Sequence, residues 1–210
     1  MINSALPTHQ RTRVSVVNKW SVSPRCGVSP RKTLYHKKWY SGFNCGASPF
    51  FVVLDNIRSL ENVGAIFRTA EALGVNKIYL GGYSGVDQFG KLHRKLAKSA
   101  LGSQNLVPFK HFKRTGRLIE KLKKQGVKII CLENRVKKTK NLLKFKPVFP
   151  LALTLGNETE GINKNILKKA DAIVEIPMLG QKESFNVATA FGIAGFEINK
   201  YRTKNHVKTF

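Results

Sequence analysis

Short apolar runs that alternate with helical patterns from Phe50 onward constrain the fold of this chain more than any other feature. A short apolar run bounded by turn residues is typical of a buried strand, and glycine just beyond a helical pattern marks its end. The expected strands are Phe50–Leu54, Lys77–Leu80, Leu106–Phe109, Val127–Leu132, Val148–Leu155 and Ala172–Ile176, and the expected helices are Glu61–Leu73, Lys91–Leu101, Thr115–Gln125 and a closing helix after Ser184. This alternation predicts an α/β fold, in which a parallel sheet carries helices on both faces.

The last long stretch, Ile176–Ile198, joins a polar start to an apolar helix. From Ser184 onward, apolar or small residues wrap most of the helical cylinder, and such a helix is normally buried. Ser184 is the expected cap, and Asn186 adds a second polar group beside free backbone N–H groups. Polar groups at the mouth of a dry element suit a ligand site, but a capped core helix explains the same pattern. The stretch alone leaves both explanations open.

Three motifs follow one another along the chain. The first comprises Asn62, Gly64, Arg68 and Gly74, the second is Gly156-Asn157-Glu158 followed by Gly161-Ile162, and the third is Ile176-Pro177-Met178, Gly180 and Ser184-x-Asn186-Val187. In order and relative spacing they resemble the signature motifs of the SpoU/TrmH family of RNA ribose 2′-O-methyltransferases, within the SPOUT superfamily. The resemblance covers roughly Phe51 to Tyr201.

This resemblance implies a fold, a cofactor and an oligomeric state. SpoU/TrmH proteins carry a C-terminal trefoil knot, a rare exception to un-knotted topology, and are homodimers with sites at the subunit interface. S-adenosylmethionine is expected among the loops after the last three strands. Carried over by position, the cofactor-binding residues are Leu132, Leu155, Gly156, Asn157, Ile176, Met178, Phe185, Asn186 and Ala188. Phe185 stands where Leu is common in the family, and Gly156 permits a close approach that a side chain would block.

Arg68 is the residue expected to act in catalysis, because its family counterpart is proposed to activate the ribose hydroxyl. A guanidinium keeps its proton far above neutral pH, which favours a phosphate clamp or an oxyanion stabiliser over a base. An ordinary surface arginine is the alternative. Asn62 is expected to cap or orient the first helix or to touch RNA, and Glu158 to hold Asn62 or Ser184 in place. Ser184 and Asn186 either position the target ribose or fix the fold locally.

The charge of the chain indicates a polyanionic partner. Lys and Arg total 37 against 12 acidic residues, which gives a formal net charge of +25. The segment Lys91–Lys146 holds 18 Lys or Arg and only two Glu, which favours a phosphate-contact face over a solvated surface with balanced ion pairs. RNA is favoured over a membrane, because no run approaches the ~20 apolar residues of a spanning helix. A lysine-rich genomic composition is the alternative explanation.

Residues 1–49 contain no Asp or Glu and show no clear periodicity. They are expected to form a flexible basic arm before the methyltransferase-like domain at 50–203 and a basic tail at 204–210. The arm either holds RNA phosphates by counterion release, or is an organellar transit peptide, or is a plain extension. The protein is accordingly expected in the cytoplasm, or in an organelle if the arm is a transit peptide.

The remaining motifs argue against several other classes. The three cysteines lack C-x-x-C spacing and the five histidines are scattered, so neither a disulfide framework nor a metal site is expected. Neither a G-x-G-x-x-G fingerprint nor a Walker loop is present in the sequence, which argues against a dinucleotide-binding protein and against an NTPase.

The function expected from the sequence is therefore S-adenosylmethionine-dependent 2′-O-methylation of tRNA or rRNA by a homodimer. Two alternatives stay open, a catalytically silent RNA-binding or ribosome-assembly factor and a SPOUT enzyme that methylates a base. The sequence names neither the RNA nor the nucleotide.

Overall fold

The computed structural model describes residues 48–134 and 136–202. Almost all of the predicted arm at 1–49, and the whole predicted tail at 204–210, lie outside the described residues. No helix within the described residues is both long enough and apolar enough to cross a membrane.

Within the described residues, seven strands form one parallel sheet in the order β3-β2-β1-β6-β4-β7-β5. The strands are β1 (Phe50–Asp55), β2 (Lys77–Gly81), β3 (Phe109–Phe112), β4 (Lys128–Leu132), β5 (Lys140–Asn141), β6 (Leu151–Leu155) and β7 (Ala172–Glu175). The chain builds β1, β2 and β3 outward in one direction and then crosses to β4, and β6 later fills the place between β1 and β4. This reversal of direction creates a crevice at the carboxyl ends of the central strands.

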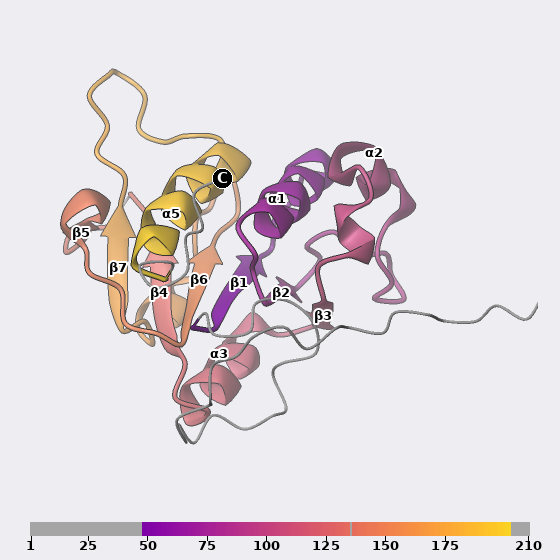
Figure 1. The fold of residues 1–210 in the computed structure, drawn as a ribbon, viewed down its shortest axis with the longest axis horizontal. Coiled ribbons are helices and arrows are strands. Elements are labelled where there is room, and N and C mark those ends of the chain that lie inside the picture. The colour runs from indigo at the N-terminus through magenta and orange to yellow at the C-terminus, as the bar shows by residue number, and fades with distance from the viewer. Residues whose placement is uncertain (1–47, 135, 203–210) are drawn as a thin grey trace, which may run out of the picture. The chain divides into compact units, whose positions relative to one another are not determined.

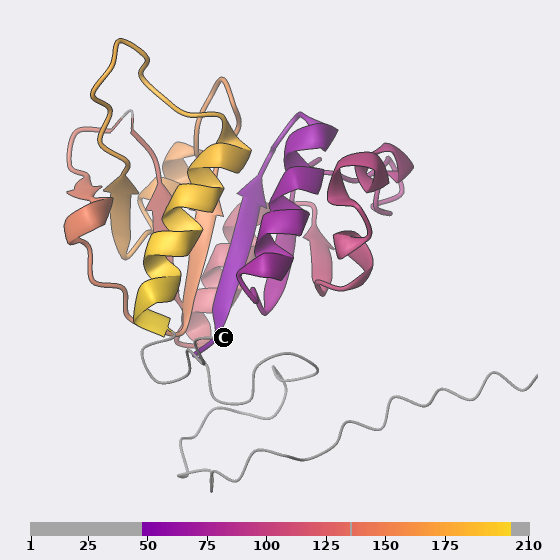
Figure 2. The ribbon, with the colours of Figure 1, turned by 45° about the horizontal axis from the view of Figure 1, so that its top comes forward.

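Helices cover both faces of the sheet, as the sequence predicts. They are α1 (Leu60–Ala72), α2 (Ala97–Ala100), α3 (Thr115–Lys124), α4 (Lys164–Leu167) and α5 (Val187–Arg202). Successive residues of a strand point to opposite faces, so Phe50 and Val52 of β1 pack with α1 and α5, whereas Phe51 and Val53 pack with α3 and α4. Figures 1 and 2 show α1 and α5 side by side on one face and α3 on the other.

Three predicted elements differ from the observed ones. The strand expected at Leu106–Phe109 is wrong, because a 3₁₀ turn at Ser103–Asn105 leads into a bend and β3 begins only at Phe109. The helix expected at Lys91–Leu101 is shorter and begins at Arg94 as a 3₁₀ turn. The strand expected from Val148 begins at Leu151, because Pro150 has no N–H to donate to the sheet.

The start and the burial of α5 also differ from expectation. Ser184 does not cap the helix. The Asn186 side-chain oxygen accepts hydrogen bonds from the N–H groups of Ala188 (2.9 Å) and Thr189 (3.4 Å), which makes Asn186 the cap. Phe191, Ala194 and Ile198 are buried, but Phe196 is 62% exposed. The helix therefore has an apolar exposed side as well as an apolar buried one.

Arg202, the last residue of α5, bonds to the chain just before β1, just after α1 and just before β2. Its buried guanidinium donates to the carbonyl oxygens of Ser48 (2.6 Å), Leu73 (3.2 Å) and Gly74 (2.8 Å) and to the side-chain oxygen of Asn76 (2.8 Å). These bonds fix α5 against α1 at the end remote from Asn186. The trefoil knot that the resemblance implies stays a prediction.

Candidate active site

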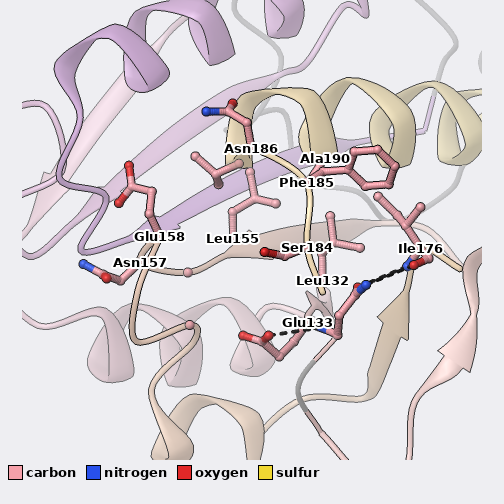
Figure 3. A pocket seen from close by; sticks show the side chains of 14 residues that line it. Leu132, Glu133, Leu155, Asn157, Glu158, Ile176, Ser184, Phe185, Asn186 and Ala190 are labelled. Atoms are coloured by element: carbon pink, nitrogen blue, oxygen red, sulfur yellow. Dashed lines mark hydrogen bonds between the residues drawn. The ribbon is translucent and has the colours of Figure 1, made fainter. Parts of the chain in front are cut away.

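The second and third motifs meet the end of β4 around one cavity. It has a volume of about 320 Å³ and lies beyond the carboxyl ends of β4, β6 and β7 (Figure 3). Seven of the predicted cofactor-binding residues line it, namely Leu132, Leu155, Gly156, Asn157, Ile176, Phe185 and Asn186. Glu158 and Ser184 line it too, as do Gly161 and Val187, which belong to the second and third motifs. The rest of the lining is Glu133, Asn134 and Ala190, which were not singled out from the sequence.

Glu133 and Asn134 join the three loops that form the cavity. Glu133 accepts a hydrogen bond from the Ile162 N–H (3.0 Å), which ties the end of β4 to the loop after β6. The Asn134 side chain donates to the Ile176 carbonyl (3.0 Å) and accepts from the Ile176 N–H (3.3 Å), which ties it to the end of β7. The only sequence signal for this pair is its place directly after the buried run Val127–Leu132.

Gly156 is required by the fold of its own loop. A Cβ added there would lie 2.3 Å from the Ile162 nitrogen and 2.4 Å from the Gly161 carbonyl carbon. Asn157 and Gly161 pair with each other through two backbone hydrogen bonds of 3.1 and 2.9 Å, which folds the loop back onto Gly156. The close approach expected at Gly156 is therefore made by the backbone of Gly161 and Ile162 in the same loop.

Asn157 lines the cavity while its side chain turns outward. Its amide nitrogen donates to the Asn56 carbonyl (2.9 Å) and the Tyr83 hydroxyl (3.0 Å), and its amide oxygen accepts from the Thr159 N–H (2.9 Å) and the Glu160 N–H (3.0 Å). Figure 3 shows this side chain directed away from Leu132 and Ile176. The side chain therefore organises the loop.

Glu158, Asn62 and Asn186 connect all three motifs at the mouth of the cavity. The Asn62 amide donates to Glu158 (2.9 Å), and the Asn186 amide donates to the Asn62 oxygen (3.0 Å). Glu158 also accepts from the N–H groups of Arg58 (3.0 Å) and Ser59 (3.2 Å). Glu158 therefore holds Asn62, one of the two partners expected for it.

These contacts also set the charge of Glu158. Partial burial acts to raise its pKa, but the hydrogen bonds from Arg58, Asn62 and Ser59 outweigh burial, and the net effect lowers the pKa of this carboxyl. Asn62 does not cap α1, contrary to one of the roles expected for it. Ser59 is the cap, with its hydroxyl accepting from the Asn62 N–H (3.1 Å).

Besides Asn62, which lies at the mouth, three predicted residues lie outside the cavity lining. Met178 lines a neighbouring open hollow with Pro177 and Glu183, which shares Asn134 and Ile176 with the cavity. Ala188 lies in the first turn of α5. Arg68 is exposed on α1 and lines a separate groove between α1 and α5, with Ser99 and Phe196 among its neighbours. Within one chain, the structure does not bring Arg68 to the cavity.

The lining of the cavity fits an adenosyl cofactor. Leu132, Leu155 and Ile176 are buried at its base and offer an apolar surface to a planar ring. Phe185, 41% exposed, and Ser184 lie at the entrance. The cavity thus combines an apolar base with polar groups at its rim, at the strand ends where open parallel sheets bind their ligands.

A parallel α/β domain with such a crevice belongs to the class of folds that bind nucleotide-like ligands at strand ends. The model of the SpoU rRNA Methylase family matches residues 49–196, and the chain belongs to that family.

Relatives and solved structures agree with this membership. The 23S rRNA (guanosine-2′-O-)-methyltransferase RlmB of Blochmanniella floridana is 32% identical over 154 residues, which cover 73% of this chain and 58% of that protein. The RlmB of Escherichia coli K12 is 30% identical over 155 residues, 74% of this chain and 61% of that protein. The chain spans about three fifths of the length of the curated relatives it matches.

Two solved structures share the fold. The AdoMet-bound rRNA methyltransferase of Sinorhizobium meliloti superposes with a TM-score of 0.66 at 28% identity, over 74% of this chain and 57% of that one. The TrmH/SpoU tRNA modifying enzyme of A. aeolicus gives a TM-score of 0.66 at 27% identity, over 75% of this chain and 77% of that one. The predicted fold class is confirmed.

Proposed function

We propose that this chain is the methyltransferase domain of an S-adenosylmethionine-dependent enzyme that methylates a ribose 2′-hydroxyl of tRNA or rRNA. The observation that carries the proposal is the hydrogen-bonded series Glu158–Asn62–Asn186, which gathers residues of three motifs beside the cavity. Family membership supports it, as do the RNA methyltransferase names of the relatives and the AdoMet bound to a structural neighbour.

In this proposal the cavity holds the cofactor and its mouth holds the ribose. Bound S-adenosylmethionine supplies a methyl group activated by a sulfonium sulfur. Leu132, Leu155 and Ile176 would hold the adenine ring, because they form the buried apolar base of the cavity. Asn186 is exposed, yet its side chain is fixed by the Asn62 contact and by its cap bonds to α5. A fixed polar group at the entrance suits positioning of a hydroxyl, on which in-line transfer depends.

We further propose that Arg68 acts at the cavity of a second copy of the chain. Arg68 lies in the groove of about 630 Å³ between α1 and α5, whose other lining is largely apolar, with Ala65, Leu73 and the exposed Phe196. An apolar surface of this kind is typical of a face that another protein surface covers. A homodimer formed across α1 and α5 would bring Arg68 of one chain to the cavity of the other. There the guanidinium would stabilise charge on the ribose oxygen or hold a phosphate.

The direct test is methyl transfer from radiolabelled S-adenosylmethionine to purified tRNA and rRNA, followed by nucleoside mass spectrometry. The expected product is a 2′-O-methylnucleoside. A methylated base would instead identify a base methyltransferase. RNA binding without transfer, together with no heat of S-adenosylmethionine binding by calorimetry, would identify a catalytically silent RNA-binding factor.

A further inference from the structure

Two exposed aromatic rings lie in the segment that follows β2, outside the three motifs. Phe89 is 77% exposed and Tyr83 is 51% exposed. Single exposed apolar side chains are common on protein surfaces and need no explanation. These two differ, because hydrogen bonds and packing hold the chain rigidly on either side of each ring.

A closed turn holds Phe89 outward. The Asp87 carboxylate accepts hydrogen bonds from the N–H groups of Phe89 (2.9 Å) and Lys91 (2.9 Å), and the Asp87 N–H donates to the Lys91 carbonyl (2.8 Å). Gly90, at φ +74°, packs against the ring of His111, which is itself bonded to the Gly82 carbonyl (2.7 Å). The turn is thereby fastened to β3, and its apolar tip faces water.

Tyr83 is fastened to the candidate active site itself. Its hydroxyl accepts a hydrogen bond from the Asn157 side chain (3.0 Å), in the loop after β6. The following residue, Ser84, is fully buried and bonded to the Gly81 carbonyl (2.8 Å) and the Ile57 N–H (2.8 Å). Tyr83 therefore places an exposed ring at the carboxyl edge of the sheet, next to the loop that carries Glu158.

Four exposed basic side chains accompany the rings, namely Lys91, Arg94, Lys95 and Lys98. No ion pair among residues 48–134 and 136–202 joins any of them to a carboxylate. Lys95 and Lys98 lie near the first turn of α1. Their charges help to lower the pKa of Glu61, after the larger effects of its backbone and Ser59 hydrogen bonds. The basic group thus flanks the helix turn that carries Asn62.

We propose that Tyr83 and Phe89, together with these four basic residues, form a platform for an unpaired segment of the RNA substrate. Bases stack on the two rings, and the phosphates between them lie against Lys91, Arg94, Lys95 and Lys98. Aromatic stacking accepts any base but requires that the base be unpaired, because a duplex hides its base faces. The proposal rests on the proposed function for its choice of RNA, and it adds that the methylated nucleotide lies in or beside a single-stranded region.

The test compares a fluorescein-labelled single-stranded RNA of about 12 nucleotides with an RNA duplex of about the same length. Anisotropy at fixed salt gives the Kd of each for the full chain. Phe89→Ala and Tyr83→Ala should each weaken single-strand binding about 10-fold and change duplex binding less than about 2-fold, because stacking contributes only to the former. Phe89→Trp and Tyr83→Phe, which keep a ring, should bind like the parent.

A matched control is Leu143→Ala, which removes a side chain that is 63% exposed at the β5 edge of the sheet. It should leave both affinities unchanged. Melting temperature and S-adenosylmethionine affinity, measured on every variant, show that the fold and the cavity persist.

The outcomes separate the platform from the proposed function. Unchanged single-strand binding in both alanine variants overturns the platform, and would assign the rings to a protein partner instead. Equal losses on single strand and duplex also overturn it, because they indicate a general electrostatic or folding effect. If the variants discriminate as expected but the parent transfers no methyl group, the platform stands and the proposed function fails.

Discussion

The cavity at the carboxyl ends of the strands and the groove between α1 and α5 are built in opposite ways. Hydrogen bonds accepted by Glu133 and Glu158 and donated by Asn134 join the loops around the cavity, and its base is apolar and buried. The groove is lined by small and apolar residues, opens to solvent at Phe196, and carries the charge of Arg68. One chain supplies the whole lining of the cavity, whereas the groove is a largely apolar surface that stays open to solvent.

Helix α1 links these two regions through two residues of one motif. Asn62 lies at the mouth of the cavity, where it is fixed by Glu158 and Asn186, while Arg68 lines the groove. Six residues correspond to about one and two-thirds helical turns, which puts the two side chains on different faces of α1. One helix therefore contributes an amide to the mouth of the cavity and a cation to the groove.

The largest effect on S-adenosylmethionine binding is expected from a substitution at Gly156, which is packed against the backbone of its own loop. Gly156→Val should abolish S-adenosylmethionine binding and lower the melting temperature by several degrees, because the added Cβ lies 2.3 Å from the Ile162 nitrogen. Calorimetry and thermal unfolding measure the two effects. Gly180→Val is the matched control, because a Cβ at Gly180 meets nothing within 4 Å. Parent affinity and parent stability in Gly156→Val would refute this account of the loop.

The second largest effect is expected at Arg68, where the methylation rate should change without a change in S-adenosylmethionine affinity. Arg68→Ala should reduce the single-turnover rate of methylation about 100-fold, as loss of a charge-stabilising donor does. S-adenosylmethionine affinity should stay at the parent value, because Arg68 does not line the cavity. Arg68→Lys should recover part of the rate if Arg68 holds a phosphate as a point charge, and none if it makes a planar two-pronged contact. A parent rate in Arg68→Ala would make Arg68 an ordinary surface residue.

A smaller effect is expected at the contact between the motifs. Glu158→Gln should reduce the methylation rate about 10-fold and stability by about 1 kcal/mol, since it weakens charge-assisted bonds to partly exposed donors. The pKa of Glu158 is lowered in the folded protein. Its contribution to stability is therefore present above the unfolded pKa of about 4.3 and is lost as the pH falls through the folded pKa.

Urea unfolding of the parent and of Glu158→Gln should accordingly differ at pH 7 and converge at acid pH. Glu160→Gln, an exposed neighbour in the same loop, should show neither the stability loss nor the pH dependence. A constant difference between parent and Glu158→Gln across this range would show that the carboxylate charge does not stabilise the contact.

Strands β1, β2, β4, β6 and β7 could be predicted from the sequence because each is a mainly apolar run, such as Val127–Leu132. The two-residue β5, Lys140–Asn141, carries no apolar signal and was not predicted. The prediction was wrong where apolar residues are buried in the core but do not form a strand. Val107 is buried within a bend, so the run Leu106–Phe109 resembles a strand that begins only at its last residue. In α5, the apolar pattern shows which residues avoid water but not what covers them. Phe196 is therefore exposed where burial was expected.

The candidate site, too, could be predicted from the sequence only in part. The motifs supplied Asn62, Glu158 and Asn186, and the contact of Glu158 with Asn62 was one of two alternatives expected from the sequence. The bond between Asn186 and Asn62 was not expected, because it joins residues 124 positions apart along the chain. Glu133 and Asn134 carry no motif, and their role arises only when the ends of β4, β6 and β7 come together. The six-residue spacing of Asn62 and Arg68 puts them on different faces of α1, but it does not show that the face of Arg68 lines a groove with α5.

The most direct test of the account asks whether the two regions complete each other across chains. A variant with a filled cavity, Ala190→Phe, is coexpressed with Arg68→Ala after calorimetry has shown that Ala190→Phe is folded and no longer binds S-adenosylmethionine. In a two-fold dimer, each mixed pair regains one site with an intact cavity and an intact arginine. Random pairing should then restore about a quarter of the parent methylation rate, although each variant alone is nearly inactive. If the mixture is as inactive as its components, Arg68 acts within its own chain or not at all, which contradicts the account.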